Sequence, residues 1–120
     1  MCPNPVMSAR YTVEMVGRVP YAIRLYNRAM ISAAVGTCGG ASSSGDVSFY
    51  CRRNMHISVF IHESAHSVDR GMSATNIWRN AVRNDACVSD PYANSNYADN
   101  FVQVAVLWTH LVGQSQHNSL

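Results

Sequence analysis

Residues 57–70 have the sequence ISVFIHESAHSVDR, in which apolar residues surround a histidine, a glutamate and a second histidine. The stretch has no glycine or proline, and Gly71, directly after it, is a common residue at the end of a helix. We therefore predict a helix over residues 57–70. His62 and His66 stand four positions apart, so they would lie one turn apart on the same face of that helix.

The pattern His62-Glu63-x-x-His66 indicates a metal site. Two imidazoles on one helix face can bind the same divalent ion, and Glu63 would lie beside the position of a metal-bound water. Zinc is the expected metal, with one ion per chain, because tetrahedral zinc commonly takes imidazole ligands. The alternative is a helix with two ordinary histidines and a surface glutamate. The apolar neighbours of the motif disfavour that alternative, since buried positions rarely hold ionisable side chains without a partner.

A catalytic zinc site needs a third protein ligand, because the fourth position is left for water. Asp99 is the first candidate, since it begins a predicted helix whose apolar face would pack against the motif helix. Asp69 lies on the motif helix itself, so we expect it outside the coordination sphere, where it would orient His66. A solvent-exposed or capping role is the alternative for Asp69. Asp85 and Asp90 occupy turn positions, where aspartate caps the backbone.

Residues after the motif extend it at a characteristic spacing. The extended pattern consists of His62-Glu63-x-x-His66-x-x-Asp69, Tyr92 and Tyr97-Ala98-Asp99-Asn100-Phe101-Val102. It resembles the zinc metallopeptidase domain shared by the anthrax lethal factor group and fungal conidiation-specific protein 13-like proteins, a deuterolysin-like metalloprotease domain. In that family a tyrosine is followed seven residues later by a metal-binding glutamate, and Tyr92 and Asp99 stand at this spacing.

The resemblance implies a role for each of these residues. His62, His66 and Asp99 would bind zinc, with aspartate in place of the family's glutamate. Glu63 would be the general base that takes a proton from zinc-bound water, and Tyr92 would donate a hydrogen bond to the oxyanion. For Tyr92 the alternative is a tyrosine that simply packs in the turn.

These residues predict a function. We expect a zinc-dependent metallopeptidase, a hydrolase that cleaves the peptide bonds of a peptide or protein substrate. The alternative is a catalytically inactive, zincin-like secreted protein that binds zinc or a partner, and a third class is a small helical interaction domain without a metal. The resemblance implies secretion. The first residues, MCPNP, have neither a basic nor an apolar segment, so the chain is either cytosolic or lacks its natural amino terminus.

The composition excludes several other classes. Of the 120 residues, 48% are hydrophobic and 13% are charged, which is too apolar for a disordered segment and suits one domain with a single core. All nine basic residues are arginine, and they are scattered, so we expect no nucleic-acid partner. The apolar stretch Phe101–Leu111 is too short to span a bilayer, so we expect no membrane segment. The sequence does not specify an oligomeric state.

The predicted fold is α+β and mainly helical, with a zincin-like metallopeptidase core. It combines the motif helix, a downstream helix that carries the third ligand, and a small N-terminal sheet. Outside the motif helix the local patterns predict strands over 10–19 and 47–51, a loop over 36–45, helices over 20–35, 73–85 and 94–112, and a disordered tail over 113–120.

The four cysteines contain no C-x-x-C pair, which excludes zinc-ribbon spacing. We expect disulfides, with four free thiols in a reducing compartment as the alternative. Three connectivities are possible, and the sequence does not choose among them. The bridge from Cys38 to Cys51 would close the shortest loop.

Overall fold

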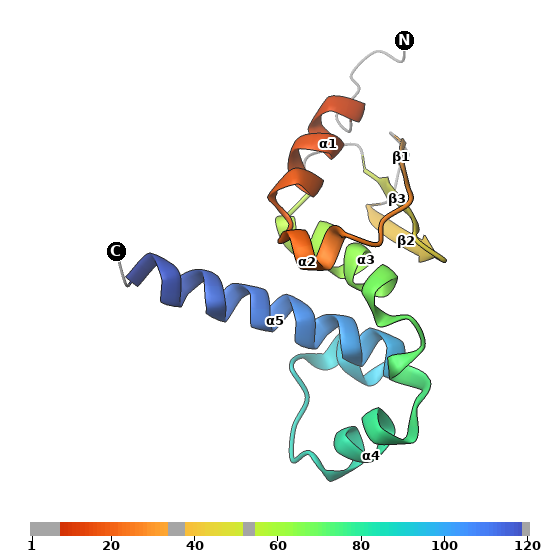
Figure 1. Cartoon of the computed structure of the whole chain (residues 1–120), viewed down its shortest axis with the longest axis vertical. Helices are drawn as coiled ribbons and strands as arrows, with labels where there is room; N and C mark the ends of the chain where they lie inside the picture. The colour runs from red at the N-terminus through yellow and green to blue at the C-terminus, as the bar shows by residue number, and fades with distance from the viewer. Residues whose placement is uncertain (1–7, 34–37, 52–54, 119–120) are drawn as a thin grey trace. The chain divides into compact units, whose positions relative to one another are not determined.

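The computed structural model describes residues 8–33, 38–51 and 55–118 (Figure 1). The chain forms two compact units, Met1–Val68 and Asp69–Leu120, which we describe one at a time. Helices predominate and a small sheet accompanies them, which confirms the mainly helical α+β class. Within the described residues, no helix is both long and apolar enough to cross a membrane.

In its described residues, the first unit combines three helices with a three-stranded sheet. The helices are α1 (Ala9–Arg18), α2 (Tyr21–Arg24) and α3 (Ile57–Asp69), and the strands are β1 (Ala29–Ala33), β2 (Gly39–Ser43) and β3 (Asp46–Tyr50). Helix α3 confirms the helix predicted over 57–70, and β3 confirms the strand predicted over 47–51.

Helix α1 replaces the strand predicted over residues 10–19, so that prediction is wrong. The alternation of apolar residues suggested a strand, but Val13, one of the residues that formed it, is 57% exposed. The buried positions are Thr12, Met15, Val16 and Val19, whose spacing of three and four residues is that of a helix. The Ser8 hydroxyl accepts a hydrogen bond from the Tyr11 backbone N–H at 3.0 Å and caps the helix.

Strand pairing overrides the local pattern in the next segment. Of the helix predicted over 20–35, the described residues form only the short α2, and β1 follows it. The loop predicted over 36–45 contains β2, and residues 34–37 lie outside the described residues. β3 is the central strand, with β1 parallel to it on one side and β2 antiparallel on the other. Ala29 pairs with Asp46, and Gly39 pairs with Tyr50. These ladders join residues far apart in sequence, and local periodicity does not report them.

A two-residue turn joins β2 to β3. Its residues, Ser44 and Gly45, have φ angles of 50° and 90°, the combination of positive values that suits the twist of a tight hairpin. A Cβ atom on Gly45 would stand 2.8 Å from the Tyr26 carbonyl oxygen, so the turn also needs glycine for lack of space.

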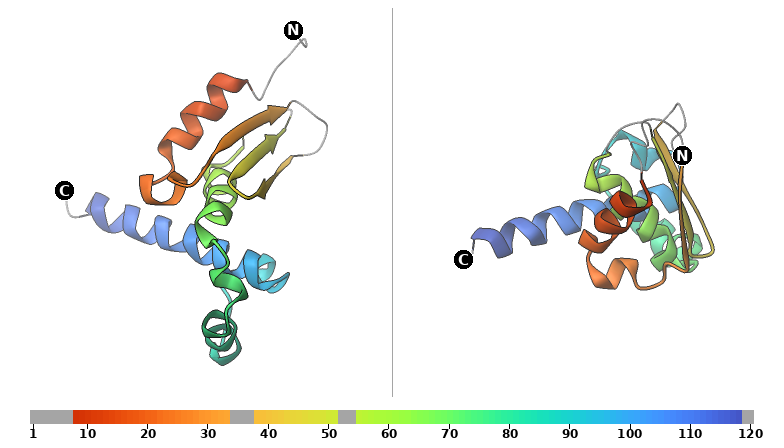
Figure 2. Two further views of the ribbon diagram at one scale, coloured as in Figure 1. Left: turned by 45° about the vertical axis from the view of Figure 1, so that its right-hand side comes forward. Right: turned by 90° about the horizontal axis from the view of Figure 1, so that it is seen from above.

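The core of the first unit lies between the sheet and its helices. Phe49 of β3 and Phe60 of α3 are fully buried, with ring centroids 4.6 Å apart. Tyr11 of α1 meets Phe60 edge-on at 6.1 Å. Figure 2 shows α1 and α3 on the same face of the sheet. The motif helix is thus anchored to the sheet by its aromatic face.

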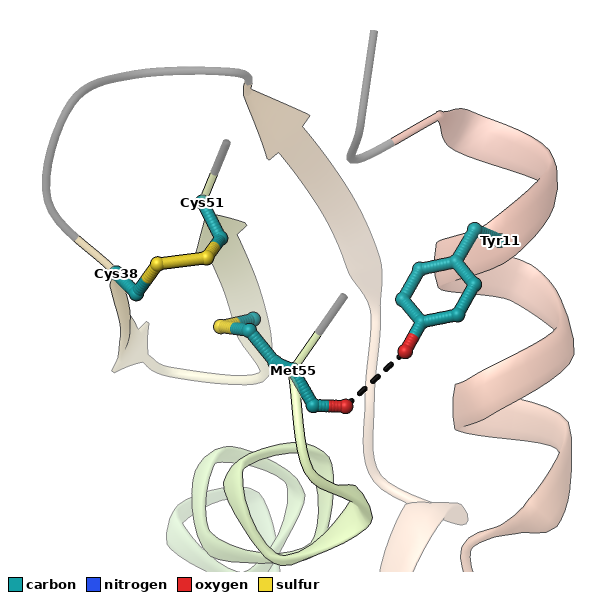
Figure 3. Close-up of a disulfide and its surroundings, with 4 residues drawn as sticks. All are labelled: Tyr11, Cys38, Cys51 and Met55. Carbon is teal, nitrogen blue, oxygen red and sulfur yellow. Dashed lines mark hydrogen bonds between the residues drawn. A yellow bond between two sulfur atoms is a disulfide. The ribbon is translucent and has the colours of Figure 1, made fainter. Parts of the chain in front are cut away.

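A disulfide closes the hairpin of β2 and β3. It joins Cys38, directly before β2, to Cys51, directly after β3 (Figure 3), the pair whose bridge closes the shortest loop. In the same region the Tyr11 hydroxyl donates to the Met55 carbonyl oxygen at 3.0 Å. Cys87 is exposed with a free thiol, and Cys2 lies outside the described residues.

The second unit is helical in its described part. It contains the 3₁₀ helices η1 (Met72–Ala74) and η2 (Pro91–Asn94) and the α-helices α4 (Asn76–Asn84) and α5 (Tyr97–Asn118). Trp78 of α4 packs edge-on against Phe101 of α5, with ring centroids 5.0 Å apart. Thr75, two residues after the predicted start of this helix, caps α4 through a hydrogen bond from the Trp78 backbone N–H.

Candidate functional site

The motif helix α3 begins with a side-chain cap from a histidine. The His56 Nδ1 accepts a hydrogen bond from the Ser58 backbone N–H at 3.1 Å, so this ring satisfies a donor in the first helical turn. From there α3 continues without a break through both histidines of the motif.

The two motif histidines face each other. The Nε2 atoms of His62 and His66 are 3.3 Å apart, their ring centroids are 4.9 Å apart, and both residues are half-buried. Two zinc-bound nitrogens, each about 2.05 Å from the ion at a tetrahedral angle of about 109°, stand about 3.3 Å apart. The rotamers of this pair therefore match the spacing that two imidazole ligands need. The same distance suits an N–H···N hydrogen bond, in which a proton takes the place of the ion.

Glu63 lies against the edge strand of the sheet. The residue is only 7% exposed, and a Cβ atom on Gly40 of β2 would stand 2.6 Å from its Cγ and 3.0 Å from its Oε1. Such distances are shorter than van der Waals contact, so the absence of a side chain at residue 40 lets the glutamate lie where it does. The sequence prediction placed residue 40 in a loop and missed this role, although a glycine inside a strand is a known signal of close approach.

Replacing Gly40 by alanine should displace Glu63. We expect Gly40→Ala to lower the free energy of unfolding by about 1–3 kcal/mol, the usual cost of overpacking. Urea unfolding of the two proteins, followed by circular dichroism, measures this loss.

A double-mutant cycle identifies the cause of that loss. In the Glu63→Ala background the three atoms nearest to the added methyl group, Cγ, Cδ and Oε1 of Glu63, are absent, so Gly40→Ala should cost much less there. Equal costs in the two backgrounds would contradict the proposed clash and would point to strand propensity at residue 40 instead.

Asp99 lies in the first turn of α5 in the second unit and takes part in its cap. Its backbone N–H donates to the Asn96 Oδ1 at 2.7 Å, and the Asn96 Nδ2 donates to the Asp99 Oδ2 at 2.7 Å. Asn96 is therefore the N-cap, two residues after the predicted start of this helix. Asp99 is 9% exposed, and its negative charge is favourable near the positive end of the helix dipole. Its role as a metal ligand stays a prediction.

The other predicted site residues also lie in the second unit. The Asp69 carboxylate accepts hydrogen bonds from the backbone N–H and the hydroxyl of Ser73, so it has the capping role that the sequence left open. The orientation of His66 by Asp69 stays a prediction. Tyr92 lies on η2 and is 55% exposed. Asp90 caps η2 through the Ala93 backbone N–H at 2.9 Å, as its turn position predicted.

Comparison with known families identifies the chain. The model of the family described as conidiation-specific protein Con-13 matches residues 1–117. The chain belongs to the Con-13 family. A similar protein is conidiation-specific protein 13 of Neurospora crassa, which is 30% identical over 115 residues, covering 88% of this chain and 34% of the relative. The chain thus spans about a third of the length of that relative. No solved structure matches it.

Membership of the Con-13 family corrects two expectations. The assignment to a zinc metallopeptidase group is wrong, because the family that matches almost the whole chain is described as a conidiation-specific one. The function expected from that assignment, peptide-bond hydrolysis, is overturned by the same finding. The error has a plain physical source: a short motif reports how two imidazoles are spaced, and that spacing does not specify a reaction.

Proposed function

We propose that this Con-13 family chain binds one zinc ion through His62, His66 and Asp99. Each of the three residues offers one ligand atom, an imidazole nitrogen or a carboxylate oxygen. The observation that carries the proposal is the 3.3 Å separation of the two Nε2 atoms. Two neutral imidazoles and one carboxylate form a donor set that suits zinc, and the carboxylate offsets one of the two charges of the ion.

The surroundings of the two histidines also support this proposal. A zinc ion with three protein ligands supplies Lewis acidity and lowers the pKa of a bound water. Glu63 follows His62 directly and is held by the backbone of β2, so its carboxylate could accept a hydrogen bond from such a water. Whether the chain is a hydrolase stays a prediction, and peptide cleavage is not part of the proposal.

The zincin-like core expected from the sequence is retained as a proposal about architecture alone. Two features support it: a helix that carries both histidines, and an edge strand whose Gly40 lies against the glutamate between them. Strand β2 runs antiparallel to its neighbour β3. An experimental structure of the zinc-loaded protein would test this architecture directly.

We further propose that the chain works in an oxidising compartment, in agreement with the secretion expected from the sequence. The bridge between Cys38 and Cys51 supports this proposal, because disulfides persist outside the reducing cytosol. Labelling of free thiols on protein taken from its native source would test it, since a reduced pair would react.

Substitution of Asp99 tests the third ligand of the proposed site. Zinc per chain is measured by elemental analysis on untagged protein, and the affinity by competition with a chromophoric chelator. We expect one zinc per wild-type chain and, for Asp99→Ala, an affinity at least roughly a hundredfold lower, because a lost ligand should cost more than a lost outer-sphere partner. Asp99→Asn keeps the size of the side chain and one oxygen, so its zinc affinity should lie between those of the wild type and of Asp99→Ala.

Two further proteins make this test specific. Asp85→Ala is the matched control, because it removes an exposed aspartate from the same unit and should leave the affinity unchanged. Asp99→Glu should weaken binding if the helix suits the shorter residue. Unchanged affinity in all Asp99 variants would remove Asp99 from the site and leave a two-histidine site. A wild-type chain without zinc affinity would reject the proposal as a whole.

A further inference from the structure

A polar side chain that precedes the sheet bonds to the motif helix. The Asn27 Nδ2 donates to the Ser64 Oγ at 2.9 Å, and the Ser67 Oγ donates to the Asn27 Oδ1 at 2.9 Å. Ser64 is fully buried and Ser67 is 8% exposed, so both hydroxyls need partners inside the protein. One carboxamide thus holds two serines that lie a turn apart on α3.

Asn27 is itself fixed by its neighbours along the chain. Its backbone N–H donates to the Arg24 carbonyl oxygen at 3.0 Å, and the next N–H, of Arg28, donates to the Gly45 carbonyl oxygen at 2.6 Å. The Arg28 guanidinium also forms two hydrogen bonds to the Asp46 carboxylate, at 2.9 and 2.7 Å. These bonds hold the pKa of Asp46 below its ordinary value. The carboxamide is therefore anchored to the turn of the sheet.

The two serines and the two histidines lie on different faces of α3. At about 100° per residue, the mean direction of Ser64 and Ser67 is roughly 150° from that of His62 and His66. Two hydrogen bonds a turn apart resist both rotation of the helix and its movement along its axis. A rotation of α3 leaves the spacing of the two imidazoles unchanged but moves both relative to any ligand outside the helix, by about 2 Å for 20°, whereas metal-ligand distances tolerate only about 0.2 Å.

We propose that Asn27 is a positioning residue for the zinc site: by holding Ser64 and Ser67, it sets the rotation of α3 and hence the direction in which the two histidines point. The inference rests on the proposed zinc site. Asn27 acts from the back of the helix, while the backbone of β2 limits the position of Glu63 on its flank. Together they fix the helix from two sides.

Substitution of Asn27 by leucine and by aspartate tests this role. Asn27→Leu keeps the approximate size but removes both hydrogen bonds. We expect zinc affinity to fall by about tenfold, the lower end of the range for outer-sphere partners, because Asn27 bonds to α3 and not to a ligand itself. Asn27→Asp keeps two acceptor oxygens to which both serine hydroxyls can donate, so it should retain most of the affinity. If Asn27→Leu does not fold, Ser67→Ala is tested in its place, because it removes only one of the two hydrogen bonds.

The control is an ion pair elsewhere in the same unit. Arg10→Gln breaks the exposed pair with Glu14 on α1 and leaves the hydrogen bonds of Asn27 in place, so it should leave zinc affinity unchanged. A merely structural role would lower the melting temperature of Asn27→Leu but not its zinc affinity once folded. That result, or equal weakening by Arg10→Gln, would overturn the inference.

A measurement that needs no metal distinguishes a failure of the proposed zinc site from a failure of the positioning role of Asn27. The nuclear Overhauser effect between the Gly40 Hα and Glu63 Hγ protons reports the rotation of α3 against β2 and needs no zinc. We expect it in the wild type and in Asn27→Asp, and expect it to weaken in Asn27→Leu. If the wild type does not bind zinc, the proposed function fails. If it binds zinc and Asn27→Leu preserves both affinity and this contact, the positioning role fails.

Discussion

Replacing His66 by alanine is expected to abolish stoichiometric zinc binding. The change removes one of the two imidazoles whose Nε2 atoms are 3.3 Å apart, and the remaining His62 and Asp99 cannot complete the proposed three-ligand site. We expect the bound zinc to fall from one per chain to none at micromolar protein. His62→Ala should have the same effect. Elemental analysis after dialysis measures both.

Thermal unfolding gives an independent readout of the same change. Ligand that binds only the folded state stabilises it by about 2.7 kcal/mol at a hundredfold excess over the dissociation constant. The wild type should therefore melt at a higher temperature with zinc than with a chelator, and His66→Ala should show no such shift. His110→Ala, which removes an exposed histidine from α5, is the control and should behave as the wild type. A full zinc shift in His66→Ala would contradict the site.

Among the substitutions proposed for this chain, Phe60→Ala is expected to cause the largest loss in the free energy of unfolding. Its ring is fully buried and contacts Phe49 of the sheet and Tyr11 of α1, so truncation leaves a cavity where α3 meets both. Such changes cost about 3–5 kcal/mol, which is a large part of the stability of a small domain. Urea unfolding measures the loss, with excess chelator present so that zinc does not contribute.

An exposed residue provides the matched control for that substitution. Val13→Ala on α1 truncates a side chain that is 57% exposed, so the free energy of unfolding should change by less than about 0.5 kcal/mol. A loss below about 1 kcal/mol in Phe60→Ala would show that the aromatic contacts do not form the core of this unit.

The success of the sequence predictions depends on where the decisive interactions lie. Helix α3 and strand β3 were predicted because their apolar patterns are local and complete. α1 was taken for a strand because Tyr11, Val13 and Met15 alternate, whereas burial follows Thr12, Met15 and Val16. β1 and β2 were missed because each exists through its ladder with β3, which no local window contains.

The candidate site was predictable to a similar extent. The pairing of His62 with His66 follows from helix geometry alone, since residues four apart share a face. Gly40 and Asn27 were not predicted, because their contacts with α3 come from segments distant in the sequence. Function proved least predictable, since the Con-13 family match overturned the peptidase expected from the motif.

The cap of α5 has a consequence for how this chain can change over generations. Asn96 and Asp99 exchange two hydrogen bonds, so the residue that starts the helix also holds the carboxylate of the proposed ligand. A longer acid at residue 99 would require a different partner at residue 96, and the loss of the amide would free both the helix end and the carboxylate. We therefore expect substitutions at residues 96 and 99 to occur together, and selection to act against either substitution alone.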